Sequence, residues 1–319
     1  MLRKPSILIV TPALAAARNG NWQTARRWAK LLDAQFNVRL APAWDGSPAD
    51  LLIALHARRS AASIAAWGAT GRPLAVVLTG TDLYRDIADD AAAQRSLALA
   101  DRLVVLQDMA PLALPPALRG KTVVCYQSTT ARQPQAKAGR YLRLLAVGHL
   151  RGEKAPEVFF ALARRFAGDH GLRFDHIGGA LDPDLGAEAA ALAAEQPDYR
   201  WLGSLPHEAV RRRIARAHLL VHPSIMEGGA HVIMEAACSG TAVLASHVDG
   251  NVGMLGAAYA GYFPPGDVDA LAALVRRCRS DPAFLAGLLA QCEARAPLFS
   301  PERERATLVQ LLHSLLEQP

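Results

Sequence analysis

Short runs of apolar residues alternate along the whole chain with longer stretches that mix apolar and polar residues. The runs are rich in Val, Ile and Leu, as strands buried on both faces are. The mixed stretch Trp22–Leu32 carries apolar residues at helical spacing and predicts a helix. Strands that alternate with helices predict an α/β fold with parallel sheets covered on both faces. In the first part of the chain, the predicted strands are Ser6–Val10, Asn37–Ala41, Leu51–Leu55, Leu74–Leu78, Arg102–Leu106 and Thr122–Cys125, and a second helix is predicted at Ala61–Trp67.

The alternation breaks at one polar, proline-containing stretch, Arg132–Gly139, which we interpret as a linker. Because 319 residues suit two domains of about 150 residues each, we expect Rossmann-like domains at 1–138 and 139–319. A last helix, expected at Glu302–Leu316, could pack on either domain. Sheets of this kind bind ligands at the carboxyl ends of their strands, so two of them predict a cleft that holds a ligand. The second domain is predicted to have strands Leu142–Val147, Phe174–Ile177, Tyr199–Leu202, Leu219–His222, Ala242–Ala245 and Gly261–Phe263, and helices Ala155–Phe166, His207–Ala217 and Ala230–Cys238.

Composition narrows the class of protein. Hydrophobic residues make up 51% of the chain, which excludes a disordered protein. No apolar run approaches the roughly 20 residues of a membrane-spanning helix, and none near the N-terminus resembles a secretory leader. The four cysteines lack the spacing of metal ligands, and we expect them to be buried thiols. These features predict a cytoplasmic protein without a bound metal.

Positive charge is concentrated in the first domain. Up to Ala138 the chain has 17 Lys and Arg against 9 Asp and no Glu, a surplus of eight, whereas the remainder has 18 against 20. A basic half suits nucleic acid or a small anionic ligand. Because no basic run is interleaved with aromatic residues, we favour the small anion.

The segment from His222 to Gly240 carries the clearest chemistry. It is predicted to run strand, turn, helix, and to end at a left-handed Gly240. Gly228 and Gly229 remove side chains where the helix begins, so backbone N–H groups there could approach an anion. Glu227 and Glu235, eight positions apart, would both offer hydroxyl acceptors, which suits a nucleoside diphosphate joined to a sugar. The alternative is one capping and one surface glutamate.

The same residues carry a family resemblance. HPSxxEGG followed by EAACSG resembles the E-x7-E signature of retaining GT-B glycosyltransferases of the family 4 type. Other landmarks of that family follow in order across the second domain: Ala146–Leu150 with Lys154, Ile177–Gly179, Leu202–Leu205 and Thr241–Ser246.

The resemblance implies roles for individual residues. Glu235 would accept from ribose hydroxyls, Glu227 from a sugar hydroxyl, and the backbone at Leu205 would hold the base. The diphosphate would be held by Lys154 and by the amides of Gly228, Gly229 and Ala230. There are two departures from the family. His149 stands where the family has arginine, with Arg151 as a substitute, and His231 either touches the sugar or is simply a polar residue at the start of a helix.

The first domain offers further candidates. In the loop after the first strand, Gly20 would permit a positive φ and Asn21 would cap the next helix; the family contacts the donor phosphate there. A plain capped turn is the alternative. Candidates for binding the acceptor, at or beyond strand ends, are His56, Arg58, Thr79 and Asp82, together with His231 of the second domain; a buried, satisfied histidine and a solvated arginine are the alternatives.

A narrower resemblance spans both domains. The segments Asn19–Trp28, Leu78–Tyr84 and Asp249–Gly256 resemble the bacterial selenosugar synthases (SenB) of selenoneine biosynthesis. This resemblance implies that UDP-N-acetylglucosamine or UDP-glucose and selenophosphate react to give a 1-seleno-sugar, UDP and phosphate, without a metal or other cofactor. It also implies two functional neighbours, a selenophosphate synthetase and a downstream selenoneine-forming enzyme.

Other functions remain open from the sequence. A general family-4 glycosyltransferase with a sugar, thiol or lipid acceptor has the same motifs, as does a non-catalytic sugar-nucleotide sensor, and a UDP-sugar 2-epimerase shares the architecture. A dinucleotide-dependent oxidoreductase would need G-x-G-x-x-G after a strand, and the chain has none.

Overall fold

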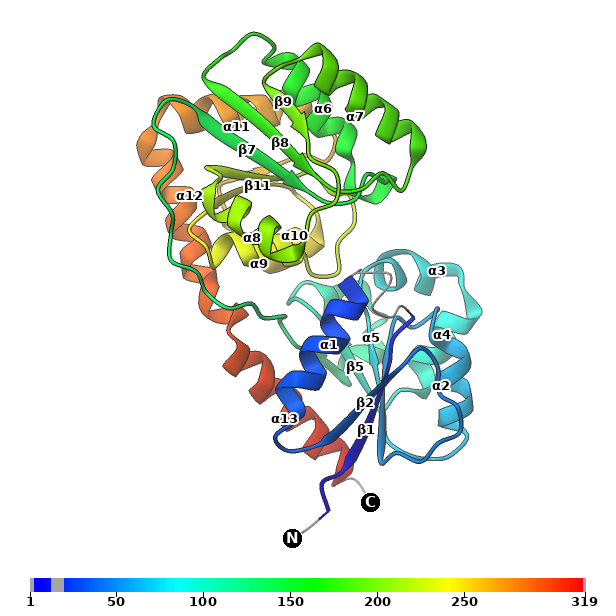
Figure 1. Ribbon diagram of the computed structural model, residues 1–319. Coiled ribbons are helices and arrows are strands. Elements are labelled where there is room, and N and C mark those ends of the chain that lie inside the picture. The colour runs from blue at the N-terminus through cyan, green and yellow to red at the C-terminus, as the bar shows by residue number, and fades with distance from the viewer. Residues whose placement is uncertain (1–2, 13–19, 318–319) are drawn as a thin grey trace. The chain divides into compact units, whose positions relative to one another are not determined.

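The computed structural model describes residues 3–12 and 20–317. Its contacts divide the chain into two compact units (Figure 1). The first unit comprises Met1–Ser128 and Leu298–Pro319, and the second comprises Thr129–Pro297. The predicted boundary at Ala138 therefore lies inside the second unit.

Polar contacts explain why the predicted linker belongs to the second unit. The N–H of Arg132 donates to Cys238 O at 2.8 Å, and Lys137 Nζ donates to Gly240 O at 2.6 Å. These bonds attach an extended segment to the end of a helix that lies a hundred residues further along the chain, which the local sequence does not reveal.

The first unit is a six-stranded parallel sheet in the order β2-β1-β3-β4-β5-β6. Successive side chains of a strand point to opposite faces. Ile7 and Ile9 belong to a buried cluster with residues of α1 and α13, whereas Leu8 and Val10 belong to a cluster with residues of α2 and α4. The elements are β1 Ser6–Val10, α1 Gly20–Leu32, β2 Asn37–Ala41, β3 Leu51–Leu55, α2 Ala61–Gly68, β4 Leu74–Val77, η2 Asp82–Asp86, α3 Ile87–Asp89, α4 Ala91–Leu99, β5 Arg102–Val105, η3 Ala110–Ala113, α5 Pro116–Arg119, β6 Thr122–Val124 and α13 Pro301–Leu316.

The last helix, α13, packs against α1 of the first unit (Figure 1). Glu304, fully buried, accepts hydrogen bonds from Arg27 at 2.8 and 2.9 Å and from Trp28 Nε1 at 2.7 Å. It also accepts from the N–H and hydroxyl of Ser128 at 3.0 and 2.5 Å. These donors compensate the cost of burying the carboxylate charge. They also attach α13, the helix that the sequence could not assign to a domain, to the first unit.

The second unit is another six-stranded parallel sheet, in the order β12-β11-β10-β7-β8-β9. Helix α6 packs with α7 and α11, and α9 packs with α8, α10 and α12. The elements are β7 Leu142–Val147, η4 Gly152–Lys154, α6 Pro156–Arg165, β8 Leu172–Ile177, α7 Pro183–Glu195, β9 Tyr199–Trp201, α8 His207–Arg216, β10 Leu219–His222, α9 His231–Ala237, β11 Ala242–Ser246, α10 Asp249–Leu255, β12 Tyr262–Phe263, α11 Val268–Ser280, α12 Pro282–Arg295 and η5 Ala296–Phe299, whose end belongs to the first unit.

Three features predicted from composition and turns are seen. All four cysteines are buried and free. Gly240 has a φ of +69°, the predicted left-handed conformation. In the part of the chain that the structure describes, no helix has both the length and the apolar character needed to cross a membrane.

Candidate functional site

The strand order of the second unit selects the place of a ligand site. From β7 the chain adds β8 and β9 on one side, and it then returns to the other side of β7 to add β10. Loops at such a switch point diverge and leave a crevice at the carboxyl ends of the strands. The two loops concerned follow β7, where Lys154 lies, and β10, where Glu227 lies.

These loops join at a charged cluster of three side chains. Lys154 Nζ donates to Glu227 Oε1 at 2.5 Å, and His222 Nε2 lies 3.0 Å from the same oxygen. Burial would raise the pKa of Glu227, but Lys154 and His222 outweigh it and hold that pKa well below its ordinary value of 4.5. Glu227 is therefore an anion that accepts hydrogen bonds at neutral pH. Its partner Lys154 lies in the loop that follows β7.

Two glycines allow the backbone to approach closely around this cluster. A Cβ on Gly178, where φ is +156°, would lie 1.8 Å from Gly148 O. A Cβ on Gly250, in α10, would lie 2.0 Å from Glu227 O. Helix α10 thus packs directly on the backbone that carries Glu227, and only glycine fits at the contact.

Gly250→Ala is expected to displace Glu227, because the obstructing atom is backbone and cannot rotate away. We expect the midpoint of thermal unfolding to fall, because the Cβ and the Glu227 carbonyl cannot both keep their places. Gly287→Ala in α12 is the control, since a Cβ there meets nothing within 4 Å and alanine favours a helix. Equal midpoints of thermal unfolding for the two variants would contradict this role of Gly250.

Glu235, a buried residue of α9, has a partner outside that cluster. It is 3% exposed, and its Oε1 lies 2.5 Å from Nε2 of His207, the first residue of α8. The hydrogen bond to Glu235 raises the pKa of His207, against the opposing effect of burial. Leu205, the residue implied to hold a base, lies two positions before His207.

The other predicted residues of the second unit have different surroundings. His149 is exposed, and its Nδ1 accepts from Gly179 N at 3.2 Å. Arg151 Nε lies 3.8 Å from Glu153, so it faces a neighbour on its own loop. Gly228, Gly229 and Ala230 form the turn before α9, which begins at His231 without a side-chain cap.

In the first unit, His56 follows β3 and is buried in a strained conformation, with a φ of +72°. Its Nε2 lies 3.1 Å from Thr81 Oγ1, and its Nδ1 accepts from Arg59 N at 3.3 Å. Burial lowers the pKa of His56, although Asp82 and Asp86 act in the opposite direction. Its surroundings are those of a neutral histidine with both ring nitrogens engaged.

The side chains of Asp82 and Arg58 also have hydrogen-bond or ion-pair partners within the first unit. Asp82 is fully buried; its carboxylate accepts from the N–H groups of Ala57, Thr79 and Gly80 at 2.8–3.0 Å. Those bonds shape the loop after β4. Arg58 pairs with Asp90 at 2.9 Å.

The loop after β1 departs from its prediction. Gly20 and Asn21 lie in the first turn of α1, so Asn21 is not the cap of that helix. Gly20 O instead accepts from Thr24 Oγ1 at 2.9 Å. Asn19, with which the narrower resemblance begins, lies outside the described residues.

Three residues near the site were missed as functional candidates: His222, His207 and Gly250. His222 stands inside the quoted motif, and its place at a strand end was the available signal. For His207 and Gly250 the sequence offers no local signal, because their partners lie 28 and 23 positions away.

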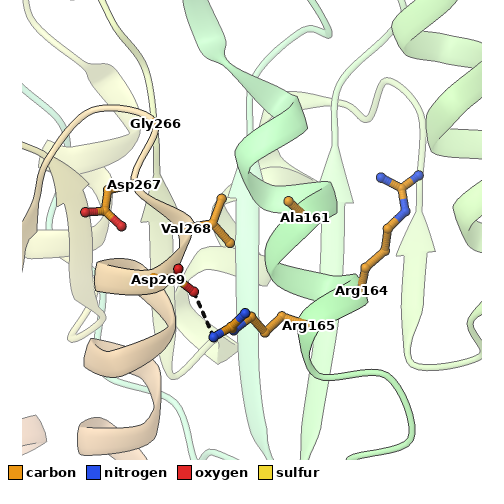
Figure 2. A pocket seen from close by; sticks show the side chains of 7 residues that line it. All are labelled: Ala161, Arg164, Arg165, Gly266, Asp267, Val268 and Asp269. Atoms are coloured by element: carbon orange, nitrogen blue, oxygen red, sulfur yellow. Dashed lines mark ion pairs between the residues drawn. The ribbon is translucent and has the colours of Figure 1, made fainter.

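Two further features do not contribute to the site. Asp182, which begins an Asp-Pro-Asp sequence, caps α7 by accepting from Asp184 N at 3.0 Å. A shallow hollow of about 640 Å³ lies between α6 and the start of α11, where Arg165 pairs with Asp269 at 2.8 Å (Figure 2). Across residues 3–12 and 20–317, no three His, Cys, Asp or Glu side chains are grouped as metal ligands would be.

Solved structures with a similar fold are numerous. HepE of Anabaena, crystallised with UDP and glucose, has a TM-score of 0.76 and 15% identity over 97% of this chain and all of that one. Sucrose-phosphate synthase from Thermosynechococcus elongatus has a TM-score of 0.79 and 19% identity over 98% and 99%. A glycosyltransferase from Rickettsia africae has a TM-score of 0.75 and 14% identity over all of both chains. At these identities the likeness establishes the fold, which is GT-B.

The sequence comparisons establish the family. No curated protein matches the chain. The family described as glycosyl transferases group 1 matches residues 127–297, which is more than half of the sequence and includes the whole second unit. The chain therefore belongs to the group 1 glycosyl transferases.

Proposed function

We propose that this protein transfers the sugar of a UDP-sugar to the selenium of selenophosphate. The observation that carries the transferase part is the cluster of Lys154, Glu227 and His222 at the switch point of the second unit. It puts an ammonium group and an anionic hydroxyl acceptor beside a turn built on two glycines.

The donor binds through groups that differ in charge. Lys154 and the amides of Gly228–Ala230 take the diphosphate, with His149 or Arg151 beside them. Glu227 accepts from a sugar hydroxyl, and Glu235 accepts from the ribose. UDP is the nucleotide we propose, because HepE, which shares the fold, was crystallised with UDP-glucose and with UDP.

The acceptor proposal rests on charge and on sequence. The first 138 residues carry the whole surplus of positive charge, which suits a small, highly anionic acceptor. The three segments that resemble selenosugar synthases occur in both units.

The proposed transfer takes two steps, formation of the carbon–selenium bond and hydrolysis of the selenium–phosphorus bond. Selenium attacks C1 of the sugar while the bond from C1 to the diphosphate oxygen breaks, and UDP leaves with the electron pair. Water then cleaves the selenium–phosphorus bond and releases phosphate and the 1-seleno-sugar. Lys154 and the amides at the glycine turn stabilise the charge on UDP as it departs. Attack from the face opposite UDP inverts C1, and attack from the same face, as the family signature implies, retains it.

A second function is a glycosyltransferase whose acceptor has an apolar part. One observation favours it: a groove of about 680 Å³ in the first unit, beside the loop that Asp82 shapes. The groove is lined mainly by apolar side chains, among them Leu83, Ile87, Leu97, Leu114 and Leu118.

UDP release distinguishes the two functions. Purified protein is incubated with UDP-glucose or UDP-N-acetylglucosamine, alone, with selenophosphate, with phosphate as the acceptor-like control, or with a long-chain alkyl glycoside as an acceptor that has an apolar part. We expect UDP to form rapidly with selenophosphate and at background rate otherwise. Release that needs an apolar acceptor would support the second function, and tight UDP-sugar binding without any release would indicate a sensor.

A further inference from the structure

The carboxylate proposed to bind the ribose is itself held by a second residue. Glu235 is almost wholly buried on α9, and Oε1 lies 2.5 Å from His207 Nε2. A buried carboxylate that must present one oxygen in a fixed direction needs a donor on the other. The His207 side chain is 60% exposed, so it lies at the surface end of this pair.

His207 also connects two parts of the proposed nucleotide site. It begins α8, and the loop before it contains Leu205, the residue proposed to hold the base. Helix α8 packs against α9, which carries Glu235. The hydrogen bond between His207 and Glu235 therefore connects the segment proposed to hold the base with the carboxylate proposed to bind the ribose.

We propose that His207 is a positioning residue for the ribose of the donor nucleotide. Its Nε2–H holds Oε1 of Glu235 and leaves Oε2 to accept from a ribose hydroxyl. This inference rests on the proposed function, in which Glu235 binds the ribose of UDP.

The charges around His207 define the pH at which this bond is strong. Glu235 raises the pKa of His207 above its ordinary 6.5, Arg211 lowers it, and Glu208, which pairs with Arg132, raises it. Because the pKa lies above 6.5, the charged form predominates at pH 6.5 and is lost as the pH rises through the raised pKa. Because charge-assisted hydrogen bonds are stronger than neutral ones, KM for the UDP-sugar should rise with pH across that interval.

The decisive test compares UDP with 2′,3′-dideoxy-UDP, which lacks the hydroxyls. Titration calorimetry gives the ratio of the two dissociation constants for each variant. We expect His207→Ala to lower this preference for UDP by about tenfold, the loss of one charged hydrogen bond, with little change for dideoxy-UDP. His207→Gln keeps a donor and should retain most of the preference, while its KM becomes independent of pH above 6.5.

A matched control is a second exposed histidine of the second unit that pairs with a carboxylate. His170, with a side chain 84% exposed, lies 3.3 Å from Asp198, and His170→Gln should leave both dissociation constants unchanged. A wild-type preference in His207→Ala, or equal losses for both nucleotides, would overturn the positioning role. Failure of the wild-type protein to bind UDP would instead overturn the proposed function, and this inference with it.

Discussion

Replacing Lys154 by alanine is expected to lower the turnover number by about two to three orders of magnitude, the usual effect of losing one donor to a developing negative charge. In the proposed function Lys154 stabilises the departing diphosphate, and in the structure it also compensates the buried Glu227 at 2.5 Å. Steady-state kinetics with saturating UDP-sugar measure the effect. Arg165→Ala, which breaks a surface pair with Asp269, is the charge-matched control and should leave turnover unchanged.

A pH series separates the two roles of Lys154. In the wild-type protein the pKa of Glu227 is lowered, so its ionisation stabilises the fold above pH 4.5, and this contribution is lost as the pH falls. Without Lys154, burial opposes that ionisation and only His222 still favours it, so the stabilisation that Glu227 contributes above pH 4.5 should shrink. The double variant Lys154→Met/Glu227→Gln removes both charges. Recovery of turnover in it would contradict a direct role for Lys154 in catalysis.

Glu304→Ala is expected to lower the unfolding free energy of the first unit by about 3–5 kcal/mol, as removing one member of a buried charge cluster does. Arg27, Trp28 and Ser128 would each lose an acceptor. Thermal unfolding measures the loss, and amide hydrogen exchange should locate it in α1 and α13.

The exposed Glu302 of the same helix provides the comparison for Glu304. Glu302→Ala should change the unfolding free energy by less than about 1 kcal/mol, the range of a charge near a helix N-terminus. Similar losses for the two variants, or unchanged exchange in α1, would contradict the role of Glu304 in fixing the last helix.

The strands were predictable because an unbroken run of apolar residues indicates a strand that is buried on both faces. Leu51–Leu55 is apolar at all five positions and buried at all five, so the predicted and observed limits agree. Helix α10, Asp249–Leu255, was not predicted as a helix, since its sequence DGNVGML contains two glycines. Position 250 needs a glycine because the carbonyl oxygen of Glu227 lies against it. The local sequence does not predict this contact, since Glu227 lies outside the helix.

The candidate site was predictable only in part, for a related reason. Glu227 and Lys154 lie 73 positions apart, and the family resemblance paired them before the structure placed them at one switch point. The acceptor-side candidates were chosen as residues at or near strand ends, and position alone does not show which partners a side chain has. Asp82 illustrates this, because main-chain N–H groups occupy its carboxylate.

The identity of the product tests the central proposal most directly. The purified protein is incubated without oxygen with a UDP-sugar and enzymatically generated selenophosphate, and the mixture is analysed by mass spectrometry. We expect a hexose or N-acetylhexosamine carrying the selenium isotope pattern, together with UDP and phosphate in equal amounts. UDP formed without any selenium-containing sugar, or formed only with another acceptor, would contradict transfer to selenium and leave a glycosyltransferase with a different acceptor.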